Sequence, residues 1–177
     1  MRKLILTHGL IAGGIVILSI IFTMYLAGDD PQIAGLEWLG YLTMLVALSI
    51  IFFGIKRYRD HELGGVIGFG TAFRLGMGVT LVASLVYVVA WEINLVLTDY
   101  AFIHDYTNAV IEDQKEAGLS GEELQQFIEG MELAKERYNN PFFRLPITFM
   151  EIFPVGVLIT LLSSALLRKG GFLAAAP

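Results

Sequence analysis

Four long apolar stretches, separated by polar or glycine-rich segments, dominate the pattern of the chain. They run from Leu4 to Leu26, Leu36 to Ile55, Leu75 to Leu97 and Leu145 to Leu167. A helix needs roughly 20 apolar residues to cross about 30 Å of hydrocarbon, and each stretch is long enough. The pattern therefore predicts an all-α fold, a four-helix transmembrane bundle that forms a single membrane domain over residues 1–177.

Composition supports a membrane location and narrows the chemistry. Hydrophobic residues make up 55% of the chain and charged residues only 16%, outside the range of ordinary soluble domains. The chain has no cysteine, which excludes disulfides, thiolate metal ligands and thiol nucleophiles. Its net charge of -5 argues against nucleic acid as a partner. The first stretch exceeds the roughly 7 to 15 residues of a secretory signal core, so we expect it to remain as a span.

Basic residues predict the orientation of the spans. They gather before the first stretch, after the second and after the fourth, at Arg2, Lys3, Lys56, Arg57, Arg59, Arg168 and Lys169. These three positions lie on one side of the membrane in a four-span chain. Cytoplasmic loops collect Lys and Arg, so we expect a multi-pass inner (plasma) membrane protein with both termini in the cytoplasm.

The segment between the third and fourth stretches, residues 98–144, is acidic. It has ten acidic residues against four basic ones, which favours the extracytoplasmic side. Gly118 supplies a helix stop, and residues 120–123 (Ser-Gly-Glu-Glu) match a capping box at the start of a second helix. Asn140 and Pro141 match the cap and first residue of the helix that becomes the fourth span. The segment therefore predicts an extracytoplasmic helical cap.

The second helix of this cap, from Gly121 to Tyr138, is amphipathic. Its apolar residues recur every three or four positions, at Leu124, Phe127, Ile128, Met131, Ala134 and Tyr138. A stripe of this kind must pack on another surface. Three surfaces are possible: the first helix of the cap, the mouths of the spans, or a partner protein.

Glycine, aromatic and small polar residues form one face of the third span and of the segment before it. In a helix this face contains Phe69, Phe73, Gly76, Thr80, Ser84 and Tyr87. Small residues let membrane helices approach closely, and hydroxyl groups bond across helices, so we expect a packing face inside the bundle. A ligand-lining face is the alternative. The sequence lacks the Gly-Lys-Ser or Gly-Lys-Thr of a phosphate-binding loop. Gly9 and Gly13 offer a second close contact in the first span.

Two glutamates within the spans form the candidate intramembrane polar site. Glu92 precedes Leu97 by five residues and Glu151 follows Leu145 by six, so both lie roughly 7 to 9 Å inside the same boundary. Two carboxyl groups that meet there would share a proton or hold a cation. The alternative is that each bonds a nearby hydroxyl, amide or water. Three further polar residues are expected to be interfacial: His8, Glu37 and Arg74.

Four short motifs carry a resemblance to a known family. They are Phe69-Gly70-x-Ala72-Phe73-Arg74, Ala83-Ser84-x-x-Tyr87, Tyr138-Asn139-Asn140-Pro141 and Glu151-x-x-Pro154-x-Gly156. With them the chain resembles a bacterial family of small four-span membrane proteins, domain of unknown function 4199. The resemblance implies a bacterial inner-membrane location. It brings no activity, cofactor or catalytic residue.

Three classes of function can be compared. We expect the protein not to be an enzyme, because the sequence has no motif that pairs a nucleophile with a base and no metal-ligand spacing. We therefore predict no catalytic residues, no metal site and no cofactor. An accessory or interaction protein is the preferred hypothesis, with the lipid bilayer, other membrane proteins or a homo-oligomer as its partners. The alternative is a small proton- or cation-coupled transporter or channel-like subunit that uses Glu92 and Glu151.

Overall fold

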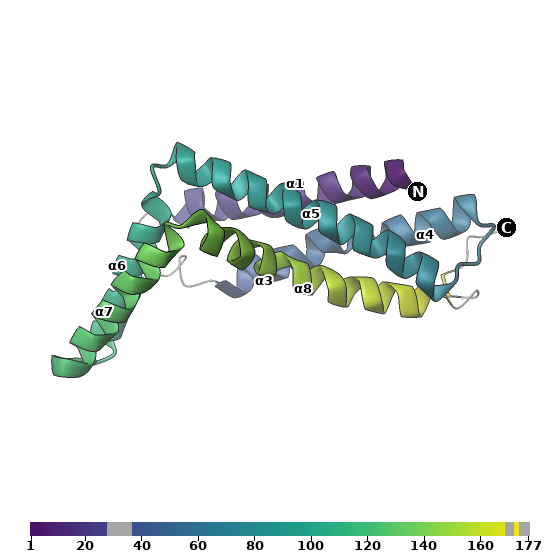
Figure 1. Ribbon diagram of the computed structural model, residues 1–177. Helices are drawn as coiled ribbons and strands as arrows, with labels where there is room; N and C mark the ends of the chain where they lie inside the picture. The colour runs from purple at the N-terminus through teal and green to yellow at the C-terminus, as the bar shows by residue number, and fades with distance from the viewer. Residues whose placement is uncertain (28–36, 169–171, 174–177) are drawn as a thin grey trace. The chain divides into compact units, whose positions relative to one another are not determined.

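The computed structural model describes residues 1–27, 37–168 and 172–173, with the side chains of 23–27 and 37–39 left out. All regular structure in these residues is α-helical (Figure 1), and the predicted all-α class is confirmed. The helices are α1 (Arg2–Ala27), α3 (Glu37–Leu48), α4 (Ile50–Glu62), α5 (Phe69–Leu97), α6 (Ala101–Glu116), α7 (Gly121–Tyr138) and α8 (Pro141–Leu167).

The four predicted membrane spans are confirmed as helices long and apolar enough to cross a bilayer. They are α1, the α3 and α4 pair, α5 and α8. Several helices exceed the apolar stretches: α4 continues to Glu62, α5 begins at Phe69, and α8 begins at Pro141. Apolarity marks only the part of a helix suited to hydrocarbon, whereas its backbone hydrogen bonds continue into the interface, where basic side chains reach water.

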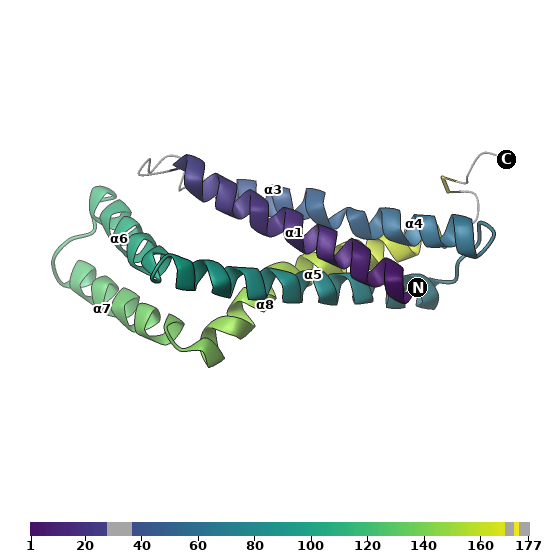
Figure 2. The same cartoon turned by 90° about the horizontal axis from the view of Figure 1, so that it is seen from above.

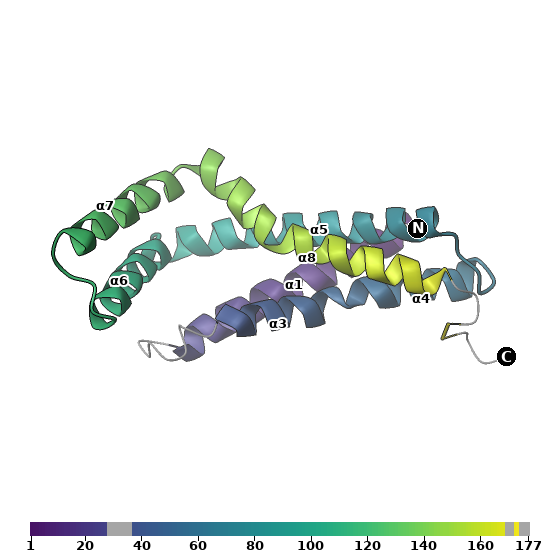
Figure 3. The same ribbon diagram turned by 90° about the horizontal axis from the view of Figure 1, so that it is seen from below.

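The chain divides into two compact units. The span unit comprises Met1–Val89 and Phe149–Pro177, and the hairpin unit comprises Ala90–Thr148. Within the span unit the helices run side by side, and the N-terminus, the end of α4, the start of α5 and the end of α8 share one end (Figures 1, 2 and 3). Arg2 and Lys3 in the first turn of α1, the basic residues near the end of α4, and Arg168 after α8 therefore gather at that end.

Glycines bring the helices of the span unit into close contact. A methyl group at Gly13 of α1 would lie 2.8 Å from the carbonyl oxygen of Ala83 on α5, and one at Gly76 of α5 would lie 2.7 Å from Cγ2 of Thr160 on α8. A side chain at Gly156 of α8 would likewise collide with Thr80. Backbones this close leave no room for a β-carbon, so α5 packs tightly against both α1 and α8.

The hairpin unit contains α6 and α7, which lie side by side and antiparallel (Figures 2 and 3). Gly118, with φ +96°, ends α6 as predicted: its N–H donates to the carbonyl of Lys115, and Leu119 N–H donates to that of Gln114. The predicted bounds of α7 are also confirmed. The capping box is wrong, because the Ser120 side chain makes no capping hydrogen bond. Gly121 has φ +62°, which leads the chain into the helix by another path.

The apolar stripe of α7 packs against α6. Phe127, Ile128 and Met131 are half-buried, and on α6 Ile103 and Thr107 are buried. The sequence left three surfaces open for this stripe: the first outer helix, the mouths of the spans and a partner protein. The structure shows that the stripe packs against the first outer helix, α6. No residue of α7 is fully buried, so this small interface stabilises the hairpin only modestly.

Candidate functional site: two polar clusters at helix ends and helix seams

An ion pair lies within the hairpin unit, between the end of α5 and the start of α8. Nε and Nη2 of Arg144, in the first turns of α8, donate to the two carboxylate oxygens of Glu92 on α5 at 2.7 and 2.6 Å. Nη1 donates to the carbonyl oxygen of Tyr138 at 2.9 Å. Arg144 is only 2% exposed, yet all three of its nitrogens have acceptors. Such a bidentate pair fixes geometry as well as charge.

Aromatic rings surround this ion pair. The Arg144 guanidinium lies 5.3 Å from the centre of the Tyr100 ring and 5.6 Å from that of Tyr138. Trp91 Nε1–H donates to the Tyr138 hydroxyl at 2.9 Å, and the Trp91 ring meets the Phe102 ring edge to face. The guanidinium therefore makes hydrogen bonds to a carboxylate and a backbone carbonyl and cation–π contacts with two rings.

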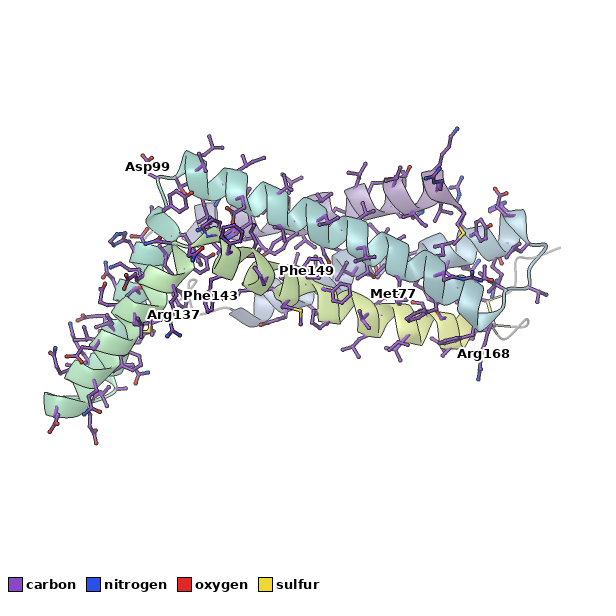
Figure 4. All side chains as sticks on the ribbon, in the orientation of Figure 1. Met77, Asp99, Arg137, Phe143, Phe149 and Arg168 are labelled. Atoms are coloured by element: carbon purple, nitrogen blue, oxygen red, sulfur yellow. The ribbon has the colours of Figure 1, made fainter. Side chains whose placement is uncertain are left out.

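The turn that positions Tyr100 has unusual backbone geometry. Asp99, labelled in Figure 4, and Tyr100 have φ values of 48° and 58°, in the left-handed region that side chains rarely adopt. Tyr100 N–H donates to the Leu95 carbonyl at 2.8 Å, which closes the C-terminal end of α5. The surrounding contacts must compensate for this strain. The cation–π contact of Tyr100 with Arg144 is one of them.

The second polar cluster runs along the seam between α5 and α8 in the span unit. The Tyr87 hydroxyl donates to Oε2 of Glu151 at 2.8 Å, and the hydroxyls of Thr80 and Thr160 are 3.1 Å apart. Ser84 lies between Thr80 and Tyr87 on α5. It is fully buried, and its hydroxyl has no partner among the described residues. The seam is therefore polar at three successive levels of a helix that is otherwise apolar.

The face predicted on the third span falls into two parts. Gly76, Thr80, Ser84 and Tyr87 are buried, and Gly76, Thr80 and Tyr87 contact α8. Phe69 and Phe73, by contrast, stack on each other with ring centres 5.9 Å apart, and Phe69 is exposed. The alternative of a ligand-lining face stays a prediction.

Glu92 and Glu151 lie in different units, and each has a partner within its own unit. Arg144 engages Glu92, and Tyr87 engages Glu151. The meeting of the two carboxyl groups therefore remains a prediction. Sequence reasoning missed Arg144 as the partner of Glu92. The available signal was the position of Arg144, three residues after Pro141 and just before the fourth span. A carboxylate near the end of a span is stabilised by a cation at a similar depth.

The other polar residues singled out from the sequence lie apart from these clusters. His8 is half-buried, with Nδ1 2.9 Å from the Leu4 carbonyl oxygen. Arg74 is exposed, and its Nε donates to the Gly70 carbonyl at 3.2 Å. The side chain of Glu37 falls outside those described. Within the described part of the chain, no three His, Asp or Glu residues are placed to hold a metal ion.

Arg59 is a buried charge that the sequence did not single out as a binding residue. It is 0% exposed; Nη1 and Nη2 donate to the carbonyl oxygens of Phe172 and Leu173 at 2.8 and 2.9 Å. Nε donates to Asp60, which also accepts from Lys56. One basic residue of the group near the end of α4 thus binds the backbone of residues 172 and 173 and does not face water.

Comparison with known proteins identifies a family. Neither the curated proteins nor the solved structures gave a match. The family model described as "Protein of unknown function (DUF4199)" matches residues 7–169, most of the chain, and all four resemblance motifs lie within it. The chain therefore belongs to the DUF4199 family, as a multi-pass membrane protein with four candidate spans.

Proposed function

We propose that this protein is a non-enzymatic accessory protein of the bacterial inner membrane, which binds another membrane protein through the acidic surface of its hairpin unit. In this proposal α6 and α7 lie on the extracytoplasmic side and both termini in the cytoplasm. The partner offers a basic surface, because opposite charges steer association and select partners.

The exposure of the hairpin's acidic residues carries the proposal. All ten acids between 98 and 144 are exposed: Asp99, Asp105, Glu112, Asp113, Glu116, Glu122, Glu123, Glu129, Glu132 and Glu136. Of the four basic residues there, Arg144 is buried against Glu92, and Lys115 and Lys135 pair with glutamates on their own helices. The excess negative charge is therefore displayed to solvent.

The Glu92–Arg144 cluster supports a role in presentation. Within the hairpin unit it joins the end of α5, the turn before α6, the end of α7 and the start of α8 through Glu92, Tyr100, Tyr138 and Arg144. A binding surface loses less conformational entropy on association when its supports are already fixed. The cluster thus serves the hairpin as a brace.

The transporter alternative uses Glu92 and Glu151 together. Arg144 occupies both oxygens of Glu92, which neutralises that carboxylate without a transported cation. Glu151 retains a protonatable group beside Tyr87, and this seam is the feature that favours the alternative. The accessory role does not require either carboxyl group to be accessible.

Charge-neutralising variants separate the two functions. The chain is purified in mild detergent from its native membranes, and co-purifying proteins are quantified for the wild type, the triple variant Glu122→Gln, Glu123→Gln, Glu129→Gln, and the control Glu62→Gln. Glu62 is an exposed acid at the end of α4. We expect the triple variant alone to lose a specific partner. Each variant is also tested for its ability to restore growth or transport in cells that lack the protein. If Glu151→Gln fails to restore it while the triple variant restores it and keeps its partners, the transporter alternative replaces the proposal.

A further inference from the structure

Helix α8 has two chemically distinct faces within the span unit. One face is buried in the unit and includes Ile152, Gly156, Thr160, Ser163 and Leu167. The outward face is exposed along its length, at Glu151, Pro154, Leu158, Leu162 and Ala165, and Glu151 lies at its edge, where it also bonds Tyr87 of the α5–α8 seam. These five residues, termed the α8 stripe, are spaced three, four, four and three apart. This is the spacing with which two helices pack at a small left-handed crossing angle.

Glu151 distinguishes the stripe from the other exposed apolar surfaces of the span unit. It lies six residues beyond Leu145, where the apolar stretch of α8 begins, which is about 9 Å along a helix at 1.5 Å per residue, and it is exposed on a helix that crosses hydrocarbon. An exposed carboxyl group at that depth is costly unless it finds a partner. Among the described residues its one hydrogen-bond partner is the Tyr87 hydroxyl, which occupies Oε2. The other oxygen remains to be satisfied.

We propose that the α8 stripe is a homodimer interface, in which α8 packs against α8 of a second copy of this chain and the two Glu151 carboxyl groups bond to each other. A two-fold contact brings the same patch of both copies together. In a membrane both copies have the same orientation, so α8 pairs in parallel and each stripe residue lies near its own counterpart.

A second copy fits Glu151 because a neutral carboxylic acid both donates and accepts a hydrogen bond. The identical group across a two-fold axis therefore satisfies it, while Tyr87 continues to donate to Oε2. Polar side chains bond across membrane helices in this way, and the remaining stripe is apolar and carries no charge that would select a different chain. This interface is separate from the acidic hairpin surface and does not depend on the proposed function.

The absence of native cysteine makes a direct cross-linking test possible. Leu158→Cys and Leu162→Cys each place one thiol on the stripe, where the native side chains are 62% and 64% exposed. Leu18→Cys on α1 is the matched control, since Leu18 is 67% exposed on another span. Oxidation in native membranes is expected to yield disulfide-linked dimers from both stripe positions and few from Leu18→Cys. Equal cross-linking at all three positions, or a product containing a different chain, overturns the proposal.

Variants of Glu151 in the Leu158→Cys background test the carboxyl pair. Glu151→Gln keeps both a donor and an acceptor, so the dimer yield is expected to be retained. Glu151→Leu removes both, and roughly a threefold or larger loss of dimer is expected from typical interhelical hydrogen bonds. A single elution peak free of aggregate and unchanged thermal unfolding identify a folded Leu variant. Undiminished cross-linking in folded Glu151→Leu contradicts the role of the carboxyl group, as does loss of the dimer in Glu151→Gln.

Discussion

Arg144 donates hydrogen bonds to both carboxylate oxygens of Glu92, and this ion pair connects the first turns of α8 to the last turns of α5. The two residues are 52 positions apart in sequence, with the whole α6 and α7 hairpin between them. Because Arg144 also caps the end of α7 through the Tyr138 carbonyl, one side chain contacts the segments before and after the hairpin.

Removing the guanidinium is expected to destabilise the protein on the order of 3 kcal/mol, because Glu92 would be left as a poorly solvated charge without its partner. Arg144→Met should therefore lower the thermal unfolding temperature in detergent. Arg144→Lys should restore little, since an ammonium group cannot reproduce the bidentate contact. The double variant Glu92→Met, Arg144→Met should recover much of the loss. Exposed Arg137→Met on α7 is the control, and an equal shift in both single Met variants would refute the brace.

Phe127→Asp is expected to open the α6 and α7 interface. Phe127 is half-buried in the stripe that faces α6, so a carboxylate there should cost about 1 to 3 kcal/mol and accelerate limited proteolysis of the hairpin. The adjacent Gln126 is exposed, and Gln126→Asp adds the same charge to the outer face. Equal proteolysis rates for the two variants would show that the stripe does not hold the hairpin together.

Two neighbouring glycines test the contact between α1 and α5. A methyl group at Gly13 would lie 2.8 Å from the Ala83 carbonyl oxygen, whereas one at Gly14 would meet no atom within 4 Å. Gly13→Ala should therefore destabilise the span unit by about 1 to 3 kcal/mol. Gly14→Ala should be neutral or stabilising by up to about 1 kcal/mol, because alanine favours helices. The measurement is thermal unfolding in detergent, and the reverse order of stabilities would exclude this packing.

Local sequence signals predicted the elements whose causes are local. Gly118 indicated the end of α6, the pattern at residues 120–123 and the spacing of apolar residues gave the bounds of α7, and Asn140 and Pro141 gave the start of α8. Asn140 Oδ1 indeed accepts from Phe142 N–H at 3.0 Å. The capping box failed because the same four-residue pattern also contains Gly121, whose left-handed φ permits a different entry into the helix.

The polar clusters were less accessible from sequence because their partners are distant along the chain. Equal depth suggested that Glu92 would meet Glu151, which stays a prediction; depth alone does not identify the partner that each residue has within its own unit. Arg144 is at a similar level to Glu92 and its opposite charge makes it the more favourable neighbour. Arg59 was assigned to the basic loop by charge alone, and nothing in its neighbours indicates that it binds the backbone of residues 172–173.

The orientation of the spans is tested by fused reporters. Because the basic residues gather at one end of the span unit, a reporter that is active only in the cytoplasm should be active after Lys169 and silent at Gly121. A reporter active only outside should give the opposite result. Cytoplasmic activity at Gly121 would overturn the predicted topology, even though the helices themselves would be unchanged.

Replacing Arg59 is expected to release the C-terminal segment. Its guanidinium donates to the carbonyl oxygens of Phe172 and Leu173, so a spin label at Phe172→Cys replaces a side chain and leaves the accepting backbone intact. In Arg59→Gln the label should become more mobile, because glutamine lacks the forked set of charged donors. Arg57→Gln removes an exposed charge from the same helix and should leave the spectrum unchanged. An unaltered spectrum in Arg59→Gln, or the same change in both variants, would mean that the segment is held by something other than this contact.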